Sequence, residues 1–416
     1  MMPQNTEALA MPTINPELAA CEALSSKEIS RQARELPDTL DLSIGEPAFD
    51  LPRSLLDDIA RQDLQGAPFL ATATRYEDLR GARVLRQAVA DWYAQRYAMT
   101  LDPEREILIT HGAVEALNLA LLCVTAPGER VACADPGYPV YARALRLCGR
   151  QAVALRRPLA EHEFAAALME APLPDCKALL LNSPENPSAY VASSADWQAI
   201  ASAVEDADCW LIHDEVYDTM AFSRTHRPAR QFPALSARSL LVNSCSKKFG
   251  MPGLRIGWLI ADGAVIDAAC KAHECLCLSV GPLAERIAAH LLNDSGAYSW
   301  LEVQRQRLQR RNQQAMARLG KEQGFRWLRE PMGGMFLFPD VGELYAQLPP
   351  AYHDSARTPG AAVADYLLRE RRVATVPGAL YGAASPQHIR LSNCGTDATF
   401  EAALERLSPL LAGAQP

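Results

Sequence analysis

Lys247 stands in a segment whose residue types could hold a ligand covalently. It follows Ser244-Cys-Ser, and Arg255 comes eight positions later, with three glycines nearby. A lysine becomes a useful nucleophile when burial or a neighbouring cation lowers its pKa, and an arginine can bind a phosphate with its planar fork. The pattern therefore favours a lysine that forms a Schiff base beside a bound phosphate. A basic, glycine-containing loop after a strand is the alternative that this segment alone leaves open.

A second candidate group follows the apolar run 210–213. Asp214 stands at the end of this run, and Tyr217 comes three positions later. Because a carboxylate at the end of a buried strand is costly without a cation, Asp214 would suit a protonated pyridine nitrogen, and Tyr217 could reach an adjacent ring oxygen. A metal-binding Asp-Glu pair or a helix N-cap at Asp214 would explain the same residues.

A candidate anion site follows the strand-like run 107–110. His111 and Gly112 lead into a helical pattern whose first residues are Ala113 and Val114. The free N–H groups at the start of a helix bind phosphate well. The segment is neither a GxGxxG fingerprint nor a Walker loop, which disfavours nicotinamide and ATP binding. An ordinary strand-to-helix turn is the alternative.

Three further side chains are candidates for ligand contacts. Asn186 stands in a proline-flanked loop and could donate to a phenolate oxygen, although an Asn-capped turn is common in such sequences. Tyr138 could stack on a flat ring, or it could be a core aromatic. Arg390, flanked by apolar residues, could bind a carboxylate with its planar fork or form a structural salt bridge.

These residues need a scaffold that brings distant segments together, and the central sequence predicts one. Short apolar runs alternate with helical patterns, which is typical of βαβ units and a mostly parallel sheet. The expected strands are 107–110, 130–134, 178–182, 210–213 and 240–243, and the expected helices include 114–124, 194–207 and 361–370. In such α/β folds the ligand site lies at the carboxyl ends of the strands, where every candidate of the central region falls.

The two ends of the chain differ from this centre. The first 50 residues contain several prolines, and an arginine- and glutamine-rich helix is expected from about residue 300. These features predict a second lobe built from both termini, with Arg390 on one of its short strands. The region after Leu64 through Thr74 is expected to be an irregular loop.

Size and composition exclude several classes of protein. At 416 residues and 45.4 kDa the chain is expected to form more than one lobe, and its net charge of -8 argues against a nucleic-acid binder. The 11 scattered cysteines indicate free thiols in a reducing compartment. Cys275-Leu-Cys277 is too closely spaced for a zinc knuckle, so no metal site is expected. Without a visible leader or spanning stretch, the sequence predicts a cytoplasmic protein with no membrane partner.

Eight elements in a fixed order resemble the class I/II aminotransferases, which are fold-type I enzymes dependent on pyridoxal phosphate (PLP). In order, they are Gly45, the Tyr-x4-Gly-x3-Leu-Arg pattern of 76–86, Gly112, Tyr138, Asn186-Pro187, Asp214 to Tyr217, Ser244 to Arg255, and Arg390. The resemblance covers nearly the whole chain. It implies an α/β fold with a large PLP-binding domain, 56–295, that holds a mostly parallel mixed sheet between helices. A smaller α+β domain would comprise 296–416 with a contribution from 1–55.

The resemblance also implies a role for each candidate. Lys247, Asp214 and Tyr217 would be the catalytic residues, with Lys247 forming the Schiff base and moving the substrate proton, and Asp214 keeping the pyridine nitrogen protonated. Gly45, Asn186 and Arg390 would bind the substrate carboxylate. Tyr76 would reach the cofactor phosphate from the partner subunit of a homodimer with shared sites. The other cofactor contacts would come from Tyr138 by stacking, from Asn186 and Tyr217 at the ring oxygen, and from Ala113, Val114, Ser244 and Arg255 at the phosphate.

The activity implied by this resemblance is transfer of an amino group between an L-amino acid and a 2-oxo acid. A PLP-dependent lyase or cyclase is the alternative, because the same fold hosts many reactions. A PLP-binding transcription regulator is disfavoured because residues 1–45 are too short and not basic enough for a DNA-binding head. Ser188 and Ala189 depart from the Thr and Gly that commonly follow Asn-Pro in the family. No arginine can be assigned to a dicarboxylate side chain, which disfavours aspartate as the amino donor.

Overall fold

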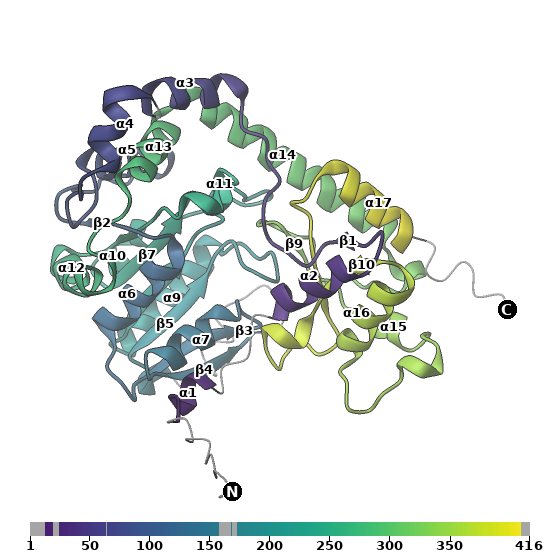
Figure 1. Cartoon of the computed structure of the whole chain (residues 1–416). Coiled ribbons are helices and arrows are strands. Elements are labelled where there is room, and N and C mark those ends of the chain that lie inside the picture. Colours follow the sequence, from purple (N-terminus) through teal and green to yellow (C-terminus); the bar gives the residue numbers. More distant parts are fainter. Residues whose placement is uncertain (1–12, 20–24, 64, 158–167, 169–172, 409–416) are drawn as a thin grey trace, which may run out of the picture.

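Two lobes make up the part of the chain that the structure describes. The computed structural model describes residues 13–19, 25–63, 65–157, 168 and 173–408. In Figure 1 the larger lobe has helices around a twisted sheet. In the smaller lobe, a purple amino-terminal segment lies among the yellow-green carboxyl-terminal elements.

A seven-stranded sheet forms the centre of the larger lobe, with the strand order β2-β8-β7-β6-β5-β3-β4. The strands are β2 Ile107–Thr110, β3 Arg130–Asp135, β4 Gln151–Arg156, β5 Ala178–Asn182, β6 Trp210–Asp214, β7 Ser239–Ser244 and β8 Gly257–Ile260. Strand β8 runs antiparallel to β2 and β7, and the other pairs are parallel. The five expected strands and the mostly parallel mixed sheet are therefore confirmed.

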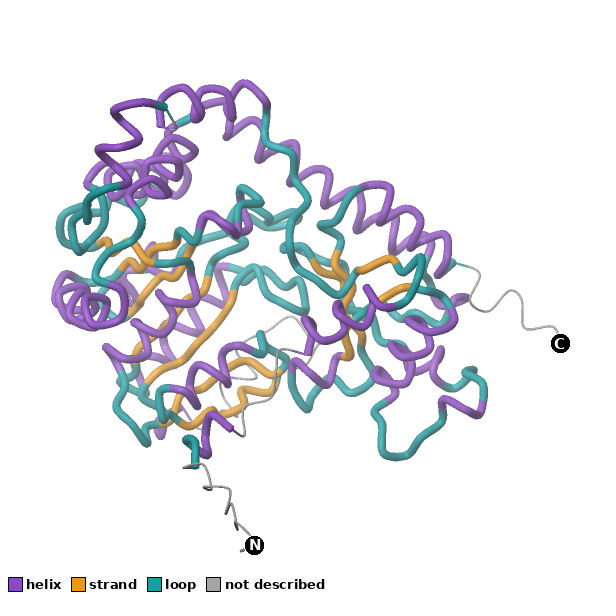
Figure 2. The backbone as a smooth tube through the Cα atoms, viewed as in Figure 1, coloured by secondary structure: helices purple, strands orange, loops and turns teal. Residues whose placement is uncertain are grey.

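Continuous apolar runs explain why this sheet is covered on both faces. Every residue of β2, β5, β7 and β8 is buried, as expected for strands between two helical layers. Figure 2 shows the orange strands with purple helices around them. One face packs against α6 Ala113–Val124, α7 Val140–Leu147 and α12 Gly263–Cys277. The other packs against α5 Arg83–Tyr97, α9 Ser194–Asp206 and α13 Pro282–Asn293.

Local sequence signals account for where the helices begin. The Ser193 side chain accepts a hydrogen bond from the Asp196 N–H at 3.1 Å, and Asp196 accepts one from the Ser193 N–H, so a capping box starts α9. Thr358 caps α16 Pro359–Glu370, whose first residue is a proline that has no N–H to satisfy. The expected helices 114–124, 194–207 and 361–370 correspond to α6, α9 and α16.

The expectation of an irregular loop after Leu64 through Thr74 is wrong. Residues Gly66–Ala73 form helix α4, whereas Leu64 lies outside the described residues. Alanine and leucine favour helix, and Pro68 falls in the first turn, where its missing N–H breaks no intrahelical bond. Helix α4 is also held from outside, because it packs against α3 Arg53–Asp63 and α13.

Segments from both ends of the described chain meet in the smaller lobe. Strand β1 Leu40–Asp41 pairs in parallel with β10 Val373–Ala374. A second small sheet has the order β11-β12-β9, with antiparallel strands Val376–Pro377, Ile389–Ser392 and Phe336–Leu337. The helices of this lobe are α2 Ser25–Glu35, α14 Ser295–Arg318, α15 Gly342–Tyr345, α16 and α17 Asp397–Leu407. The boundaries at residues 55 and 295 stay a prediction.

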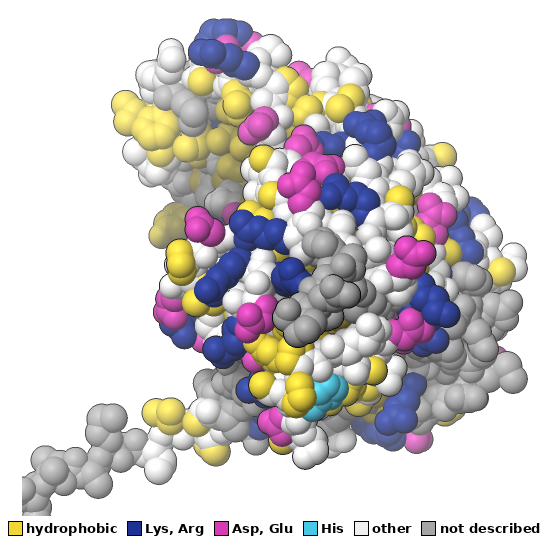
Figure 3. Space-filling model, turned by 90° about the vertical axis from the view of Figure 1, so that its right-hand side faces the viewer, with side chains coloured by type: hydrophobic (Ala, Val, Ile, Leu, Met, Phe, Trp, Pro, Cys, Tyr) yellow, Lys and Arg dark blue, Asp and Glu magenta, His cyan; other side chains and the backbone are white. Residues whose placement is uncertain are grey.

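Three short helices complete the described α-helices: α1 Pro16–Ala19, α10 Pro233–Ser236 and α11 Cys245–Lys248. Among the described residues, no helix combines the length and apolarity that crossing a membrane requires. On the face drawn in Figure 3, Lys and Arg side chains alternate with Asp and Glu side chains.

Candidate active site

A cavity of about 250 Å³ lies at the carboxyl ends of β5, β6 and β7. Its walls come from both lobes, because Phe336 and Arg390 belong to the small sheet and Gly45 follows β1. Eleven of the predicted site residues line this cavity: Gly45, Ala113, Val114, Tyr138, Asn186, Asp214, Tyr217, Ser244, Lys247, Arg255 and Arg390. The carboxyl-end rule for α/β sheets therefore located the cavity from sequence.

Lys247 is held by the short helix α11, which starts directly after β7. The Ser244 hydroxyl caps this helix by accepting a hydrogen bond from the Ser246 N–H at 3.3 Å. Lys247 Nζ donates to the Gly45 carbonyl oxygen at 2.7 Å. Burial lowers the pKa of Lys247 from its ordinary value of 10.5, and nearby Arg390 acts in the same direction. The amine is thereby brought closer to its neutral, nucleophilic form.

Asp214 is the last residue of β6, and its carboxylate is buried. One oxygen, Oδ2, accepts from the Tyr141 hydroxyl at 2.8 Å, and Oδ1 accepts from the Val216 N–H at 3.2 Å. Burial raises the pKa of Asp214 to about 6, although both hydrogen bonds favour the charged form. A cation placed in the cavity beside this carboxyl group would restore its charge.

Arg390 and Asn186 form a polar pair on the small-lobe side of the cavity. Arg390 Nη1 donates to Asn186 Oδ1 at 3.2 Å, and Nη2 donates to the Ser43 carbonyl oxygen. The guanidinium carbon lies 4.2 Å from the centre of the Phe336 ring, which fixes the plane of the fork. Arg390 Nε is buried and has no hydrogen-bond partner among the described residues. The planar cation is thus fixed beside the cavity.

The loop that carries Asn186 also explains one departure from the family pattern. Asn182 Oδ1 accepts from the Asn186 N–H at 2.7 Å, which ties the loop to the end of β5. Ala189 has a φ of 60°, a conformation that glycine adopts without strain. The altered residue therefore keeps the turn that a glycine would make.

An anion cradle lies where β2 leads into α6. The N–H groups of Ala113 and Val114 are the first of the helix and have no acceptor within it. Arg255 Nη2 donates to the His111 carbonyl oxygen at 3.1 Å. A Cβ at Gly112 would lie 2.6 Å from Arg255 Nη2, so a side chain there would displace the arginine. Helix N–H groups, an arginine and the Ser244 hydroxyl are the donors that a phosphate prefers.

Three tyrosines complete the walls. Tyr138 and Tyr141 pack edge to face, with ring centres 5.5 Å apart. Tyr217 is buried and packs edge to face on Phe336 at 5.8 Å. Burial raises the pKa of Tyr217 well above its ordinary value, so its hydroxyl keeps its proton and serves as a donor.

Comparison with known proteins identifies the family. Residues 37–407 match the family described as aminotransferase class I and II. The chain belongs to this family. It is 31% identical over 369 residues to arginine–pyruvate transaminase of Pseudomonas aeruginosa, covering 85% of each chain. It is 34% identical over 259 residues to methionine aminotransferase of Escherichia coli, covering 61% of this chain and 64% of the relative.

The fold is shared with solved aminotransferases as well. The structure of N-succinyldiaminopimelate aminotransferase from Mycobacterium tuberculosis is 26% identical and superposes with a TM-score of 0.84 over 96% of this chain and 100% of that one. Class I and II aminotransferases of this fold use PLP, and this aminotransferase is a PLP-dependent enzyme. None of these relatives favours the lyase or cyclase alternative.

The residues of the cavity fit this cofactor. The anion cradle has the donors and the glycine spacing that a phosphate needs, and it lies in the same cavity as the lysine that would bind the aldehyde. Among the described residues, the carboxyl group of Asp214 has hydrogen-bond partners but no ion-pair partner, and a protonated pyridine nitrogen would supply one.

Tyr76 is the one predicted site residue that does not line this cavity. Its side chain is 82% exposed and lies in a separate surface pocket of about 830 Å³, beside Arg75 and Arg286. The expected contact from the partner subunit requires an exposed residue of this kind, so the position of Tyr76 is compatible with that prediction.

Sequence reasoning missed two positioning residues. Tyr141 donates to the Asp214 carboxylate, and Asn182 Nδ2 donates to the Asp214 carbonyl oxygen at 2.9 Å. The sequence did contain a signal for Tyr141, since it follows Tyr138 after the same strand. Asn182 is the last residue of an apolar strand, which is the position that also marked Asp214.

Proposed function

We propose that Lys247 and Asp214 are the two side chains on which the aminotransferase reaction depends. The observation that carries this proposal is that a lysine with a lowered pKa and a carboxyl group with a raised pKa line one cavity. Bound PLP, with its ring nitrogen protonated, withdraws electrons from the substrate so that the proton on Cα becomes acidic.

Lys247 has two tasks in this proposal. Its amine binds the cofactor, and the lowered pKa supplies the neutral form that this attachment needs. Nζ would also be the base that removes the proton from the substrate Cα. The hydrogen bond to the Gly45 carbonyl orients Nζ within the cavity before the cofactor binds.

The other residues hold the cofactor and the substrate in place. Asp214 pairs with the protonated ring nitrogen, and Tyr217 and Asn186 bind the ring oxygen. Arg390 binds the substrate carboxylate with its fork, which fixes the direction of the Cα–H bond. Tyr138 stacks on the ring, and the phosphate is bound by Ala113, Val114, Ser244 and Arg255.

The proposed working unit is a homodimer in which Tyr76 of the partner subunit contacts the phosphate. Support comes from exposed apolar side chains on the larger lobe, including Leu70, Leu276 and Leu278, which are 60%, 60% and 52% exposed. Covering such side chains is a common reason for self-association.

Mixing two inactive variants tests the shared site. In a heterodimer of Tyr76→Ala and Lys247→Ala subunits, one site holds both changes and the other holds neither. We expect activity to appear when the two variants are dissociated and reassociated together. If verified heterodimers stayed inactive, the proposal that Tyr76 contributes to the active site of the partner subunit would be wrong.

We further propose that the preferred amino donor has no carboxylate in its side chain. The charged residues that line the cavity are Asp214, Lys247, Arg255 and Arg390, and each has a task with the cofactor or the α-carboxylate. No described cation of this cavity is left for a second carboxylate, whose burial without a partner is costly.

A half-reaction assay tests both the activity and the donor. The PLP form is mixed with methionine, arginine or aspartate, and loss of the cofactor absorbance is followed, then its return on addition of pyruvate or 2-oxoglutarate. We expect kcat/KM for methionine to exceed that for aspartate by at least about 10-fold. A preference for aspartate would overturn the donor proposal. Loss of absorbance that no oxo acid reverses would overturn transamination itself.

The proposed location is the cytoplasm, with no nucleic-acid or membrane partner. Ten cysteines in the described residues are all free, which suits a reducing compartment. Fractionation of cells that produce the protein tests this location.

A further inference from the structure

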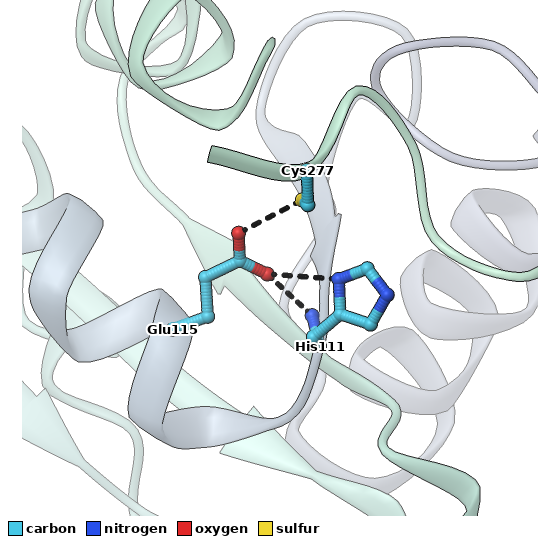
Figure 4. A group of neighbouring side chains, drawn as sticks. All are labelled: His111, Glu115 and Cys277. Carbon is cyan, nitrogen blue, oxygen red and sulfur yellow. Dashed lines mark hydrogen bonds and ion pairs between the residues drawn. The ribbon is translucent and has the colours of Figure 1, made fainter. Parts of the chain in front are cut away.

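A cluster of side chains that could bind a metal lies next to the anion cradle. Figure 4 shows Glu115 between His111 and Cys277, with all three side chains directed toward one another. One ligand atom from each residue can be chosen so that all three lie within 4.8 Å of one another. Neither the cofactor nor the substrate contacts proposed above use these side chains.

The donor set is typical of zinc. Imidazole nitrogen, thiolate sulfur and carboxylate oxygen are the usual protein ligands of Zn²⁺, whereas Mg²⁺ and Ca²⁺ prefer oxygen ligands alone. A carboxylate and a thiolate carry two negative charges, which balance the charge of the ion. Three protein ligands leave the fourth tetrahedral position for water.

Rigid elements hold two of the ligands. Glu115 stands in the first turn of α6, and its Oε2 accepts from the His111 backbone N–H at 2.5 Å. Cys277 is the last residue of α12, and its Sγ lies 3.2 Å from Glu115 Oε1. His111 Nδ1 lies 3.5 Å from Glu115 Oε2. The last two distances are measured to different oxygens of Glu115, so both oxygens face the cluster. One ligand atom from each residue lies within 4.8 Å of the other two, and a turn of the His111 ring would shorten this to the spacing of neighbouring ligands around one tetrahedral ion.

His273 contacts the cluster from the protein interior. It is fully buried, one helical turn before Cys277, and its Nδ1 lies 2.9 Å from Glu115 Oε1. Metal-binding carboxylates are commonly held by such a hydrogen bond, which orients the ligand and raises metal affinity. The side chain of His111 is 40% exposed, so it can turn toward an ion that enters from solvent.

We propose that His111, Glu115 and Cys277 bind one zinc ion, with His273 orienting Glu115. Binding displaces the thiol proton of Cys277 to solvent as the Zn–S bond forms, and His111 binds in its neutral form. The ion would connect the end of α12 to the residues just before Ala113 and Val114, and so would fix the cradle from outside. The expectation of no metal site considered only the Cys275-Leu-Cys277 spacing, whereas these ligands come from two distant segments.

Zinc content of the holoenzyme tests this proposal. The purified PLP-loaded protein is dialysed against Zn²⁺ buffered by a competing chelator, and zinc per chain is measured by atomic absorption. We expect one zinc per chain at micromolar free zinc. X-ray absorption at the zinc edge should show one sulfur at about 2.3 Å and nitrogen or oxygen ligands at about 2.0–2.2 Å.

Matched variants separate this site from adventitious binding. Cys277→Ser and His111→Ala should each weaken zinc binding by at least about 100-fold, and His273→Asn by about 10–100-fold. Cys275→Ser, which removes an exposed cysteine of the same helix, should leave it unchanged. An unaltered cofactor spectrum and circular dichroism identify the variants that have folded, and His111→Ala changes a partly exposed side chain. Less than one zinc per chain, a spectrum without sulfur, or equal binding by Cys277→Ser or His111→Ala would overturn the proposal.

Discussion

A lysine and an aspartate occur together in two neighbouring regions, the cavity and a buried layer formed by Lys248, Asp218 and the side chains that contact them. In the cavity the two residues are not paired with each other, whereas in the buried layer they form an ion pair. In the cavity, Lys247 donates to a carbonyl oxygen, and Asp214 accepts from a hydroxyl and a backbone N–H. In the buried layer, Lys248 Nζ lies 3.1 Å from Asp218 Oδ1 and also donates to Asn243 Oδ1 at 2.7 Å. Each residue of the second pair is one or four positions beyond its counterpart in the chain.

Aromatic side chains complete the buried layer. Lys248 Nζ lies 4.7 Å from the centre of the Trp258 ring, and Asp218 Oδ2 accepts from the Tyr97 hydroxyl at 2.9 Å. Burial alone would raise the pKa of Asp218, but Lys248 and other nearby cations outweigh it and lower that pKa. In the cavity, by contrast, burial prevails and the pKa of Asp214 rises to about 6.

This difference shows how the fold separates stability from reactivity. A buried charge that has its partner stays charged and holds elements together. A buried ionisable group without a charged partner shifts toward its neutral form. A ligand that brings a charge of opposite sign stabilises the charged form of this group, and that interaction contributes to binding of the ligand. Substitutions at the two lysines should therefore have opposite consequences.

The largest expected effect is on catalysis, from Lys247→Ala. We expect kcat to fall by about 10⁴-fold or more, because both the attachment of the cofactor and the base are lost. The midpoint of thermal unfolding of the cofactor-free protein should stay within a few degrees of the unaltered protein. Steady-state kinetics and calorimetry check the two parts. A folded Lys247→Ala variant with near-normal turnover would show that Lys247 is not required for catalysis, and would contradict the proposed difference between the two lysines.

Lys248→Met should act on stability instead. The change leaves Asp218 buried without its cation, which costs about 3–5 kcal/mol of unfolding free energy. Urea unfolding at fixed protein concentration measures this loss. Lys248→Met with Asp218→Asn should recover part of the loss, because no charge is then left unpaired. If Lys248→Met were as stable as the unaltered protein, the ion pair between Lys248 and Asp218 would not contribute to stability as proposed.

The pH dependence of the cofactor-free protein distinguishes the two aspartates. Asp214 has a pKa of about 6 when folded against an ordinary value of 3.8, so folding favours its protonated form. Its contribution to stability is full below pH 3.8 and is lost as the pH rises through 6, by about 3 kcal/mol in total. The lowered pKa of Asp218 gives the opposite sign, since its contribution is lost as the pH falls.

Urea unfolding of cofactor-free protein at pH 4 and pH 7 measures this effect. We expect the stability difference between the unaltered protein and Asp214→Asn to change by about 2 kcal/mol across this range, because the unfolded carboxyl group is already partly charged at pH 4. If Asp214 binds the cofactor as proposed, bound cofactor should remove the change, because the protonated ring nitrogen would supply a cation. If the unfolding free energies of the two cofactor-free proteins depended on pH in the same way, the raised pKa of Asp214 would be contradicted.

Tyr141→Phe is expected to have the smallest effect. It removes one hydrogen bond to the Asp214 carboxylate, worth about 1.5 kcal/mol, so kcat should fall by about 10-fold. The pKa of Asp214 in the cofactor-free protein should rise further, which the same unfolding series at several pH values detects. A fall in kcat with no change in that pH series would mean that Tyr141 acts by another route.

The central strands and most of the site could be predicted from sequence, and for a physical reason. Strands buried on both faces require apolar runs, so a polar residue at the end of such a run, such as Asp214, is conspicuous. The antiparallel strand β8 was not predicted, because its first residue, Gly257, comes soon after Lys247 and Arg255 and was interpreted as part of the same glycine-containing loop. Helix α4 was expected to be an irregular loop, whereas its contacts with α3 and α13, which the sequence does not show, favour the helix.

The buried layer could not be predicted in the same way. The order Ser244-Cys-Ser-Lys selects Lys247 for the cofactor, but nothing in the sequence assigns a partner to the adjacent Lys248, because the direction its side chain takes depends on the fold. The partners of Lys248 come from β7 and from the turn after β6, and their proximity depends on strand pairing. The metal-site candidates were missed for the same reason, since Cys277 meets Glu115 only through the packing of α12 on α6.

The pairing of β1 with β10 has a consequence for how the protein is made. Strand β1 leaves the ribosome early, whereas β10 is synthesised tens of seconds later at ordinary rates of translation. Gly45 lies four residues after the end of β1, and Arg390 is synthesised later than β10. The residues proposed to hold the cofactor, from Ala113 to Arg255, are therefore synthesised before β10, and the proposed carboxylate ligand Arg390 is added only near the end of synthesis.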